Sequence, residues 1–266
     1  MIDKLYGFIL YLGKMGTGMI DTAVSMTGLF FDASLAAVHA IRRPNLSFFT
    51  QMSRQILYTG VEAFWLVGII AFLAGSTIIL QAMNNAPLFG VTEYFGNILV
   101  ISVVRELGPF FTSLVVIGRS GAALAAHVGN MKVAKEIAAL EVMGIDPVNY
   151  LVFPALLGMI GSMICLNIYF DLIAILGGLL VAKITVDVPF IIFMGKVLEA
   201  LTLGDILVSI GKSVLFGSII AIVSCHSGFT VQNIRGVPQA SIKAVVTSMT
   251  LTIIINAIVT IGFYVR

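Results

Sequence analysis

Five long apolar runs, each free or nearly free of charged residues, follow one another along the chain. They cover approximately residues 62–82, 94–118, 150–172, 206–227 and 244–265, and after Asp171 the third continues without a charge as far as Ala182. A helix needs about 20 apolar residues to cross a hydrocarbon core that is ~30 Å thick. The pattern therefore predicts an all-α membrane protein with about five transmembrane helices.

The composition supports this prediction. Of 266 residues, 59% are hydrophobic and 11% are charged, and the mean hydropathy is +1.08, whereas about 25% of the residues of an average soluble domain are charged. Soluble enzymes and nucleic-acid-binding proteins are excluded on this ground. The formal net charge of +2 also implies no polyanionic partner.

The basic residues that flank the apolar runs are unevenly distributed. Cytoplasmic connections of membrane proteins carry the excess of Lys and Arg. The more basic side consists of the amino terminus, the 119–149 segment and the 228–243 loop, with these residues: Lys4, Lys14, Arg42, Arg43, Arg54, Arg119, Lys132, Lys135, Arg235 and Lys243. We therefore expect these parts on the cytoplasmic side and the carboxyl terminus on the other side.

The first 58 residues have a different pattern from the rest. Apolar residues recur at helical spacing from Ile2 to Leu12, as in a helix that lies in the headgroup plane, and a second short amphipathic stretch covers Phe48–Tyr58. We predict an interfacial amphipathic region over 1–58 and a transmembrane domain over 59–266. An additional buried helix is the alternative for the first region.

Arg105 and Glu106 stand about halfway along the second predicted span. An ionisable residue at that depth costs about 2.5–3.5 kcal/mol on insertion. Neighbours on a helix point about 100° apart, so each of the two needs a partner on another helix or water, and Asn167 and Asp171 in the third span are candidates. Pro109 predicts a kink that frees the carbonyl of Arg105. Two roles are open: an ion pair that locks helices, or a place on a transport path.

The segment between the second and third spans predicts a short amphipathic helix over 131–143. Val133, Ile137 and Leu140 share one face of it, and Gly144 suits the left-handed position that ends a helix. Such a helix can lie on headgroups or dock into the groove of a partner protein.

Signals for catalysis or metal binding are weak. Gly211, Lys212 and Ser213 resemble the end of a phosphate-binding loop, but Ile206 replaces its first glycine. The three histidines and two cysteines are too far apart for a typical metal motif: His39, His127, His226, Cys165 and Cys225. We expect no catalytic residue, no metal site and no disulfide.

Two stretches resemble a known family. RELGP from Arg105 and GRSGAALAAHVGNMKVAKEIAALEVMGIDP from Gly118 are similar to the signature of the MlaE (YrbE-like) permeases, and LGGLLVA from Leu176 and KAVVTS from Lys243 extend the match. The resemblance runs from about Val61 to the end. Permeases of that family are membrane subunits of ABC transporters that work with MCE-domain proteins to move phospholipid or other lipid between the inner and outer membranes of Gram-negative bacteria.

The resemblance implies a cytoplasmic coupling helix over about 131–144 that docks on a separate ABC ATPase subunit, which binds the ATP and Mg; this chain would bind no cofactor itself. The implied contacts with the ATPase are Glu136, Ile137, Leu140, Glu141, Met143 and Gly144. The other implied partners are an MCE-domain periplasmic protein, a second copy of the chain and phospholipid, with no nucleic acid. The implied location is the bacterial inner membrane, crossed several times, with the amino terminus in the cytoplasm.

The resemblance also implies a lipid cavity at the interface of a homodimer. Its expected path is formed by the polar pair Arg105 and Glu106 and by Ile78 and Gln81 near the outer end of the first span. His127, Ala139 and Asn256 depart from the family pattern, since an acidic residue is usual at the first position and Asp is common at the other two.

Two other classes of function fit the residues: a membrane scaffold that anchors partners without transport, and an intramembrane lipid-modifying enzyme. A lipid cavity with polar residues at mid-depth would separate a permease from a scaffold. An ATPase that copurifies with the chain would separate a permease from an enzyme.

Overall fold

The computed structural model describes residues 25, 27–29, 46–84, 98–186 and 189–264. All regular secondary structure in these ranges is helical, and five helical spans are long and apolar enough to cross a membrane. Their bounds are Gln55–Ala82, Val100–Val133, Val148–Thr185, Leu203–Phe229 and Ile234–Phe263. The prediction of an all-α membrane protein with about five spans is confirmed.

The spans are built from the following helices. The first belongs to α2 (Leu46–Asn84). The second joins a π-helix η1 (Val100–Leu107), α5 (Gly108–Val116), a second π-helix η2 (Ile117–Gly121) and α6 (Ala122–Val133). After α7 (Glu136–Val142), the third joins η3 (Val148–Val152) and α8 (Phe153–Val186). A short helix α9 (Phe190–Ala200) precedes α10 (Leu203–Phe229), and the fifth joins η4 (Ile234–Gly236) and α11 (Val237–Tyr264).

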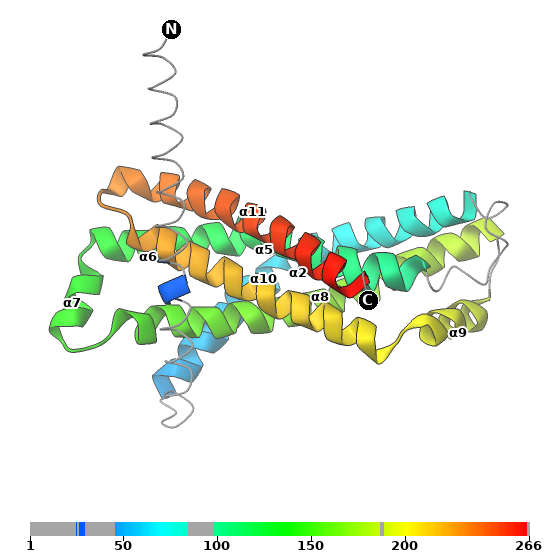
Figure 1. The fold of residues 1–266 in the computed structure, drawn as a ribbon, viewed down its shortest axis with the longest axis horizontal. Coiled ribbons are helices and arrows are strands. Elements are labelled where there is room, and N and C mark those ends of the chain that lie inside the picture. The colour runs from blue at the N-terminus through cyan, green and yellow to red at the C-terminus, as the bar shows by residue number, and fades with distance from the viewer. Residues whose placement is uncertain (1–24, 26, 30–45, 85–97, 187–188, 265–266) are drawn as a thin grey trace, which may run out of the picture.

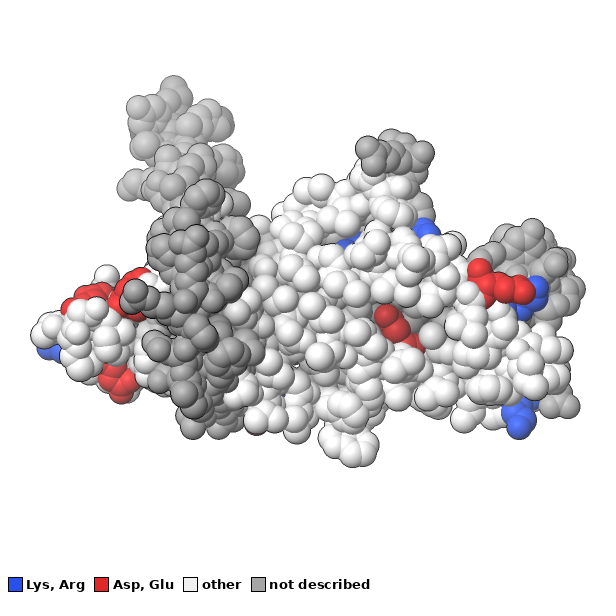
Figure 2. Space-filling model, turned by 90° about the horizontal axis from the view of Figure 1, so that it is seen from below, with Lys and Arg blue, Asp and Glu red and all other residues white. Residues whose placement is uncertain are grey.

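The long helices run along the long axis of the molecule (Figure 1). Helix α2 lies against α8, and α10 packs against α8, α6 and α11. One end of the molecule carries α7 and the turn from α10 into α11, and the opposite end carries α9 with the ends of α2 and α8. On the face seen in Figure 2, most of the coloured charged groups lie toward the two ends, and the middle is mainly white with one red group and a little blue. Charged side chains are costly inside hydrocarbon.

The second and third spans are longer than the sequence predicts. The second continues past residue 118, where the predicted span ends, to Val133. Arg119 donates to the Glu62 carboxylate of α2 at 2.7 Å, with both side chains nearly half exposed. A helix of 34 residues is about 51 Å long, so it extends beyond the ~30 Å hydrocarbon core. The predicted loop 119–149 therefore begins with the end of η2, followed by helix α6.

The single helix predicted over 131–143 is wrong, because the chain breaks before Glu136. Lys135 adopts the left-handed backbone conformation with φ of 60°, which separates α6 from α7. Gly144 has φ of +74°, as its predicted role at the end of the helix requires.

The first span is continuous with residues that precede it. Helix α2 begins at Leu46 and crosses the predicted boundary between residues 58 and 59. Phe48–Tyr58 therefore forms one helix with the first span. Residues 1–24 and 30–45 of the predicted interfacial region lie outside the described residues.

Small residues allow α2 and α8 to approach closely. A Cβ atom on Gly75 of α2 would overlap the backbone carbonyl of Ala174, and one on Gly177 of α8 would lie 2.5 Å from the carbonyl oxygen of Phe72. Real Cβ atoms do not come so near to a carbonyl oxygen. The two backbones are therefore in contact, as in other membrane helix pairs that pack through small residues.

We predict that Gly75→Ala destabilises the protein by about 1–3 kcal/mol, because the added methyl group must push α8 away from α2. Thermal unfolding of the purified protein in detergent measures the effect. Gly60→Ala is the matched control on the same helix, since a Cβ there meets nothing within 4 Å. Equal melting temperatures for the two variants would contradict the close contact.

Candidate functional site

Two ion pairs connect η1 with α10. Arg105 Nε donates to Asp205 Oδ1, and Lys212 Nζ lies 2.9 Å from Glu106 Oε1. The side chains from α10 are buried, with 1% of Asp205 and 0% of Lys212 exposed, whereas 18% of Arg105 and 26% of Glu106 is exposed. The side chains of Arg105 and Glu106 are therefore partly exposed, whereas their partners Asp205 and Lys212 are buried.

Lys212 finds an acceptor for each of its three ammonium protons. Its Nζ donates to Glu106 Oε1, to Thr260 Oγ1 at 3.0 Å and to the backbone carbonyl of Arg105 at 3.1 Å. The Thr260 hydroxyl lies 3.1 and 3.0 Å from the two carboxylate oxygens of Glu106 and donates to that carboxylate. The buried Lys212 side chain therefore has both a counter-charge and a full set of hydrogen-bond acceptors.

Pro109 explains why a carbonyl oxygen is free to accept from Lys212. Proline has no backbone N–H, so the carbonyl four residues earlier, that of Arg105, lacks its helical donor. Lys212 Nζ supplies that donor. The kink expected at Pro109 stays a prediction; what the structure shows is a π conformation over η1, directly before α5, in which about one residue more fits into each turn.

Asp205 is held by the start of α10 as well as by Arg105. Its Oδ2 accepts from the backbone N–H of Thr202 at 2.9 Å and from the Thr202 hydroxyl at 2.7 Å, and the Thr202 hydroxyl accepts from the Asp205 N–H in return. This is a capping box, which satisfies backbone donors that a helix start leaves free. We call Arg105, Glu106, Asp205, Lys212 and Thr260 the polar cluster.

The sequence predicted the need for partners but not the partners themselves. Asn167 and Asp171, the predicted candidates, form no ion pair with Arg105 or Glu106; Asn167 Nδ2 instead donates to Ser209 Oγ at 2.7 Å. A usable signal was the spacing of Asp205 and Lys212, which are seven residues, or about two turns, apart and so lie on one face of α10.

The depth of the pair also differs from the prediction. Arg105 and Glu106 are the sixth and seventh residues of the span that begins at Val100, so they lie nearer its α9 end than its middle. Lys212 is nine residues, or about 14 Å, from the start of α10 at Leu203. The polar cluster therefore occupies the half of the molecule nearer α9.

The other two residues of the expected lipid path lie on α2. Ile78 is half-buried and packs against the core, and Gln81 is exposed. Both are within the last two turns of the first span, which ends at Ala82.

The expected ATPase contacts divide into two groups. Ile137 and Leu140 are 2% and 9% exposed and are buried in the chain's own core, so they do not present a free face to a partner. Glu136, Glu141, Met143 and Gly144 are exposed. Val142, which the sequence did not single out, is 89% exposed beside Met143 at 63%.

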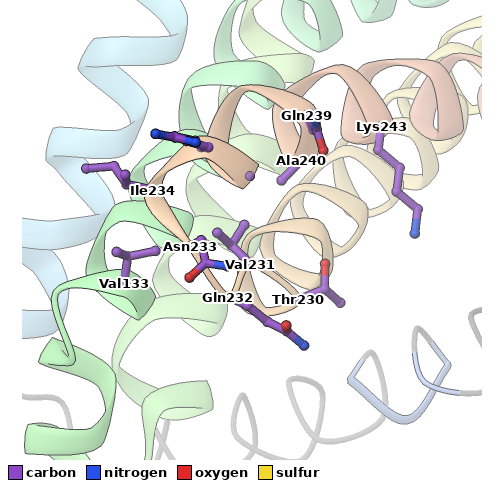
Figure 3. Close-up of a pocket in the computed structure, with 11 residues that line it drawn as sticks. Val133, Thr230, Val231, Gln232, Asn233, Ile234, Gln239, Ala240 and Lys243 are labelled. Carbon is purple, nitrogen blue, oxygen red and sulfur yellow. The ribbon is translucent and has the colours of Figure 1, made fainter.

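A hollow of mixed polar and apolar lining lies beside the turn from α10 to α11. Its volume is about 980 Å³, and it is lined by Val133 of α6 and by residues between Thr230 and Lys243 (Figure 3). Arg235 and Lys243 are the charged residues of its lining. Across the described part of the chain, no group of three or more His, Cys, Asp or Glu side chains could hold a metal ion.

We predict that Lys212→Met destabilises the protein by about 3 kcal/mol, since it leaves the Glu106 carboxylate without its counter-charge at membrane depth. Glu106→Gln combined with Lys212→Met should restore most of the abundance, because both charges are then gone. Abundance in the membrane and thermal unfolding measure both effects. A single variant as abundant as the wild type would contradict the structural importance of the pair.

Comparisons with known proteins agree with the sequence patterns. The sequence profile of the family described as "Permease MlaE" matches residues 52–261. A "Probable ABC transporter permease protein" of Rickettsia bellii is 34% identical over 252 residues, which cover 94% of this chain and 96% of that protein.

More distant relatives extend the comparison. A probable ABC transporter permease protein of Synechocystis is 32% identical over 76% of this chain and 77% of its own length. The chloroplastic protein TRIGALACTOSYLDIACYLGLYCEROL 1 of Arabidopsis thaliana is 29% identical over 74% of this chain and 56% of its own length. The chain is thus a member of the MlaE permease family, a multi-pass ABC transporter permease.

Proposed function

We propose that the chain moves phospholipid between the inner and outer membranes of a bacterium, powered by ATP and Mg bound to a separate ATPase subunit. Its family membership as an ABC transporter permease supports the role of a transport subunit. The single observation that favours a lipid is the partial exposure of Glu106 and Arg105 at membrane depth, beside apolar surfaces.

A phospholipid matches that surface in both of its parts. The exposed edges of Glu106 and Arg105 offer charged groups to a headgroup, which hydrocarbon alone would not solvate. The Phe263 ring lies 5.2 Å from the Arg105 guanidinium carbon. Ile261 on α11 and Leu207 on α10, each two residues in sequence from Phe263 or Asp205, are exposed. These apolar side chains would accommodate the acyl chains of the same lipid.

A homodimer would complete the cavity. Among the spans, α11 and α2 are the least enclosed by this chain: 17% and 28% of the residues in their most apolar windows are buried. Two copies that meet around the polar cluster would enclose a lipid that one chain leaves open on one side. Ile78 and Gln81, at the end of the first span, are the residues of α2 that we assign to this cavity.

The charge distribution supports an orientation in the bacterial inner membrane. Lys132, Lys135, Arg235 and Lys243 lie at the α7 end of the molecule, and Lys183 and Lys196 lie at the α9 end. The excess of basic residues favours the α7 end as the cytoplasmic one. The amino terminus and the ATPase then face the cytoplasm, and an MCE-domain protein meets the α9 end in the periplasm.

Helix α7 is the proposed contact with the ATPase. Val142 and Met143 provide an exposed apolar tip, and Glu136 and Glu141 provide exposed charge around it. Ile137 and Leu140 are buried and hold α7 against the rest of the chain, which fixes the position of the exposed residues.

We predict that Val142→Asp weakens binding of the ATPase about tenfold or more, because it places a charge in a contact that excludes water. The abundance of the permease should not change, since the side chain is 89% exposed. Leu140→Asp is the contrasting variant: its charge enters the chain's core, so it should reduce abundance. If the Val142→Asp variant pulls down the ATPase at the wild-type level, the proposed contact between α7 and the ATPase is contradicted.

We also predict that the double variant Glu106→Gln, Lys212→Met is abundant and binds the ATPase but transfers phospholipid poorly. It keeps the size of both side chains and removes both charges, of which the one on Glu106 is open to a headgroup. ATP-dependent transfer of labelled phospholipid in reconstituted vesicles is the measurement. Wild-type transfer by this variant would refute a transport role for the pair, and transfer that is absent even from the wild type would favour a scaffold.

A further inference from the structure

Three oxygen atoms converge on Gly108, at the junction of η1 and α5. If Gly108 carried a Cβ atom, that atom would lie 2.8 Å from Asn167 Oδ1 and 3.2 Å from the carbonyl oxygen of Val103, and it would overlap Asp171 Oδ1. The absence of a side chain at Gly108 is therefore what allows the two polar side chains of α8 to reach this junction.

All three oxygens are hydrogen-bond acceptors, and few donors are available to them. The Gly108 N–H already donates to the Val103 carbonyl, and the Asn167 amide nitrogen already donates to Ser209 Oγ. Asn167 Oδ1 and Asp171 Oδ1 are buried without a hydrogen-bond partner, and Asn167 is 1% exposed. The junction lacks one donor.

Among the side chains that the structure describes, no cation is placed to supply it. The described charged side chains on the segments packed against α8 are engaged elsewhere: Arg105 with Asp205, Lys212 with Glu106, Glu62 of α2 with Arg119, and Lys196 with Glu199 on α9. Helix α5 carries no ionisable residue, and His226 lies near the far end of α10. Lys183 on α8 is twelve residues, or about 18 Å, from Asp171.

We propose that Asp171 is a proton-binding site, whose carboxyl O–H donates to Asn167 Oδ1. The two residues are four apart on α8, so their side chains are neighbours on one face of the helix. The buried Oδ1 of Asp171 has no counter-charge among the described side chains, and an O–H on that oxygen provides the missing donor. One bound proton thus satisfies two buried groups.

The position of this proton connects it with the polar cluster. Asn167 binds Ser209 of α10, and Gly108 follows directly after η1, so the protonated pair joins α8 to both elements that carry the ion pairs. Loss of the proton would leave a carboxylate facing two other acceptor oxygens and would loosen this contact. The stability of the protein should therefore fall as the pH rises through the titration of Asp171.

Infrared spectroscopy of the full-length permease, in complex with its ATPase and in a lipid bilayer, tests the assignment directly. The wild type minus Asp171→Asn difference spectrum should contain the C=O stretch of a protonated carboxyl group and should shift in D₂O. The matched control is Glu199→Gln, which removes an exposed carboxylate on α9 and should leave that band in place. A difference spectrum with only carboxylate bands would overturn the proposal, and so would loss of the C=O band on addition of Na⁺ or K⁺ at constant pH, since an alkali cation would then be the occupant.

Thermal unfolding against pH gives a second, independent readout. Asp171→Asn supplies a neutral donor at every pH, so it should keep its melting temperature at alkaline pH, where that of the wild type falls. Asp171→Leu should be less stable at every pH because Asn167 Oδ1 then has no donor. Identical pH dependence of the wild type and Asp171→Asn, or failure of Asp171→Asn to accumulate, would overturn the proposal. These outcomes do not depend on which solute the permease moves.

Discussion

The burial of the Lys212 ammonium group is the constraint on which the rest of the site depends. A charge with no exposed surface inside an apolar helix bundle needs a counter-charge and a full set of acceptors. Two other segments supply them: η1 provides the Glu106 carboxylate and the Arg105 carbonyl, and α11 provides the Thr260 hydroxyl. The requirement therefore fixes how η1, α10 and α11 lie against one another.

The same constraint gives a physical role to an irregular stretch of helix. A regular α-helix would use the Arg105 carbonyl within its own ladder, but Pro109 removes the donor and η1 adopts a π conformation. The Arg105 carbonyl accepts a hydrogen bond from Lys212 Nζ. The second span then runs from this polar cluster to Val133 next to α7. One span thus joins the proposed lipid contact at one end to the proposed ATPase contact at the other.

Much of the fold could be predicted from the sequence, because a bilayer imposes one simple requirement on every span. The five apolar runs identified the five helices, and Gly144 identified the end of α7. The ends of the spans were less predictable: Arg119 looked like the end of one, but the span continues through it to Val133, and Arg119 pairs with Glu62 on α2. The break at Lys135 was missed because a left-handed lysine has no sequence signal comparable with that of glycine.

The site was predictable only in part. The cost of burying Arg105 and Glu106 required partners, but their choice depends on how helices far apart in the chain pack, which periodicity does not report. Asp205 and Lys212 lie about one hundred residues after the pair. The inward orientation of Ile137 and Leu140 was hidden for the same reason, since an amphipathic face packs equally well against the chain itself or against a partner.

The central claim is that this chain forms a lipid-binding permease that is driven by a separate ATPase. Native mass spectrometry of the chain purified with its associated subunits tests it most directly. The account predicts a particle that contains two copies of this chain, an ATPase and bound phospholipid, and the phospholipid should be lost when both charges of the Glu106–Lys212 pair are removed. A particle with one copy of the chain, without ATPase or phospholipid, would contradict the account.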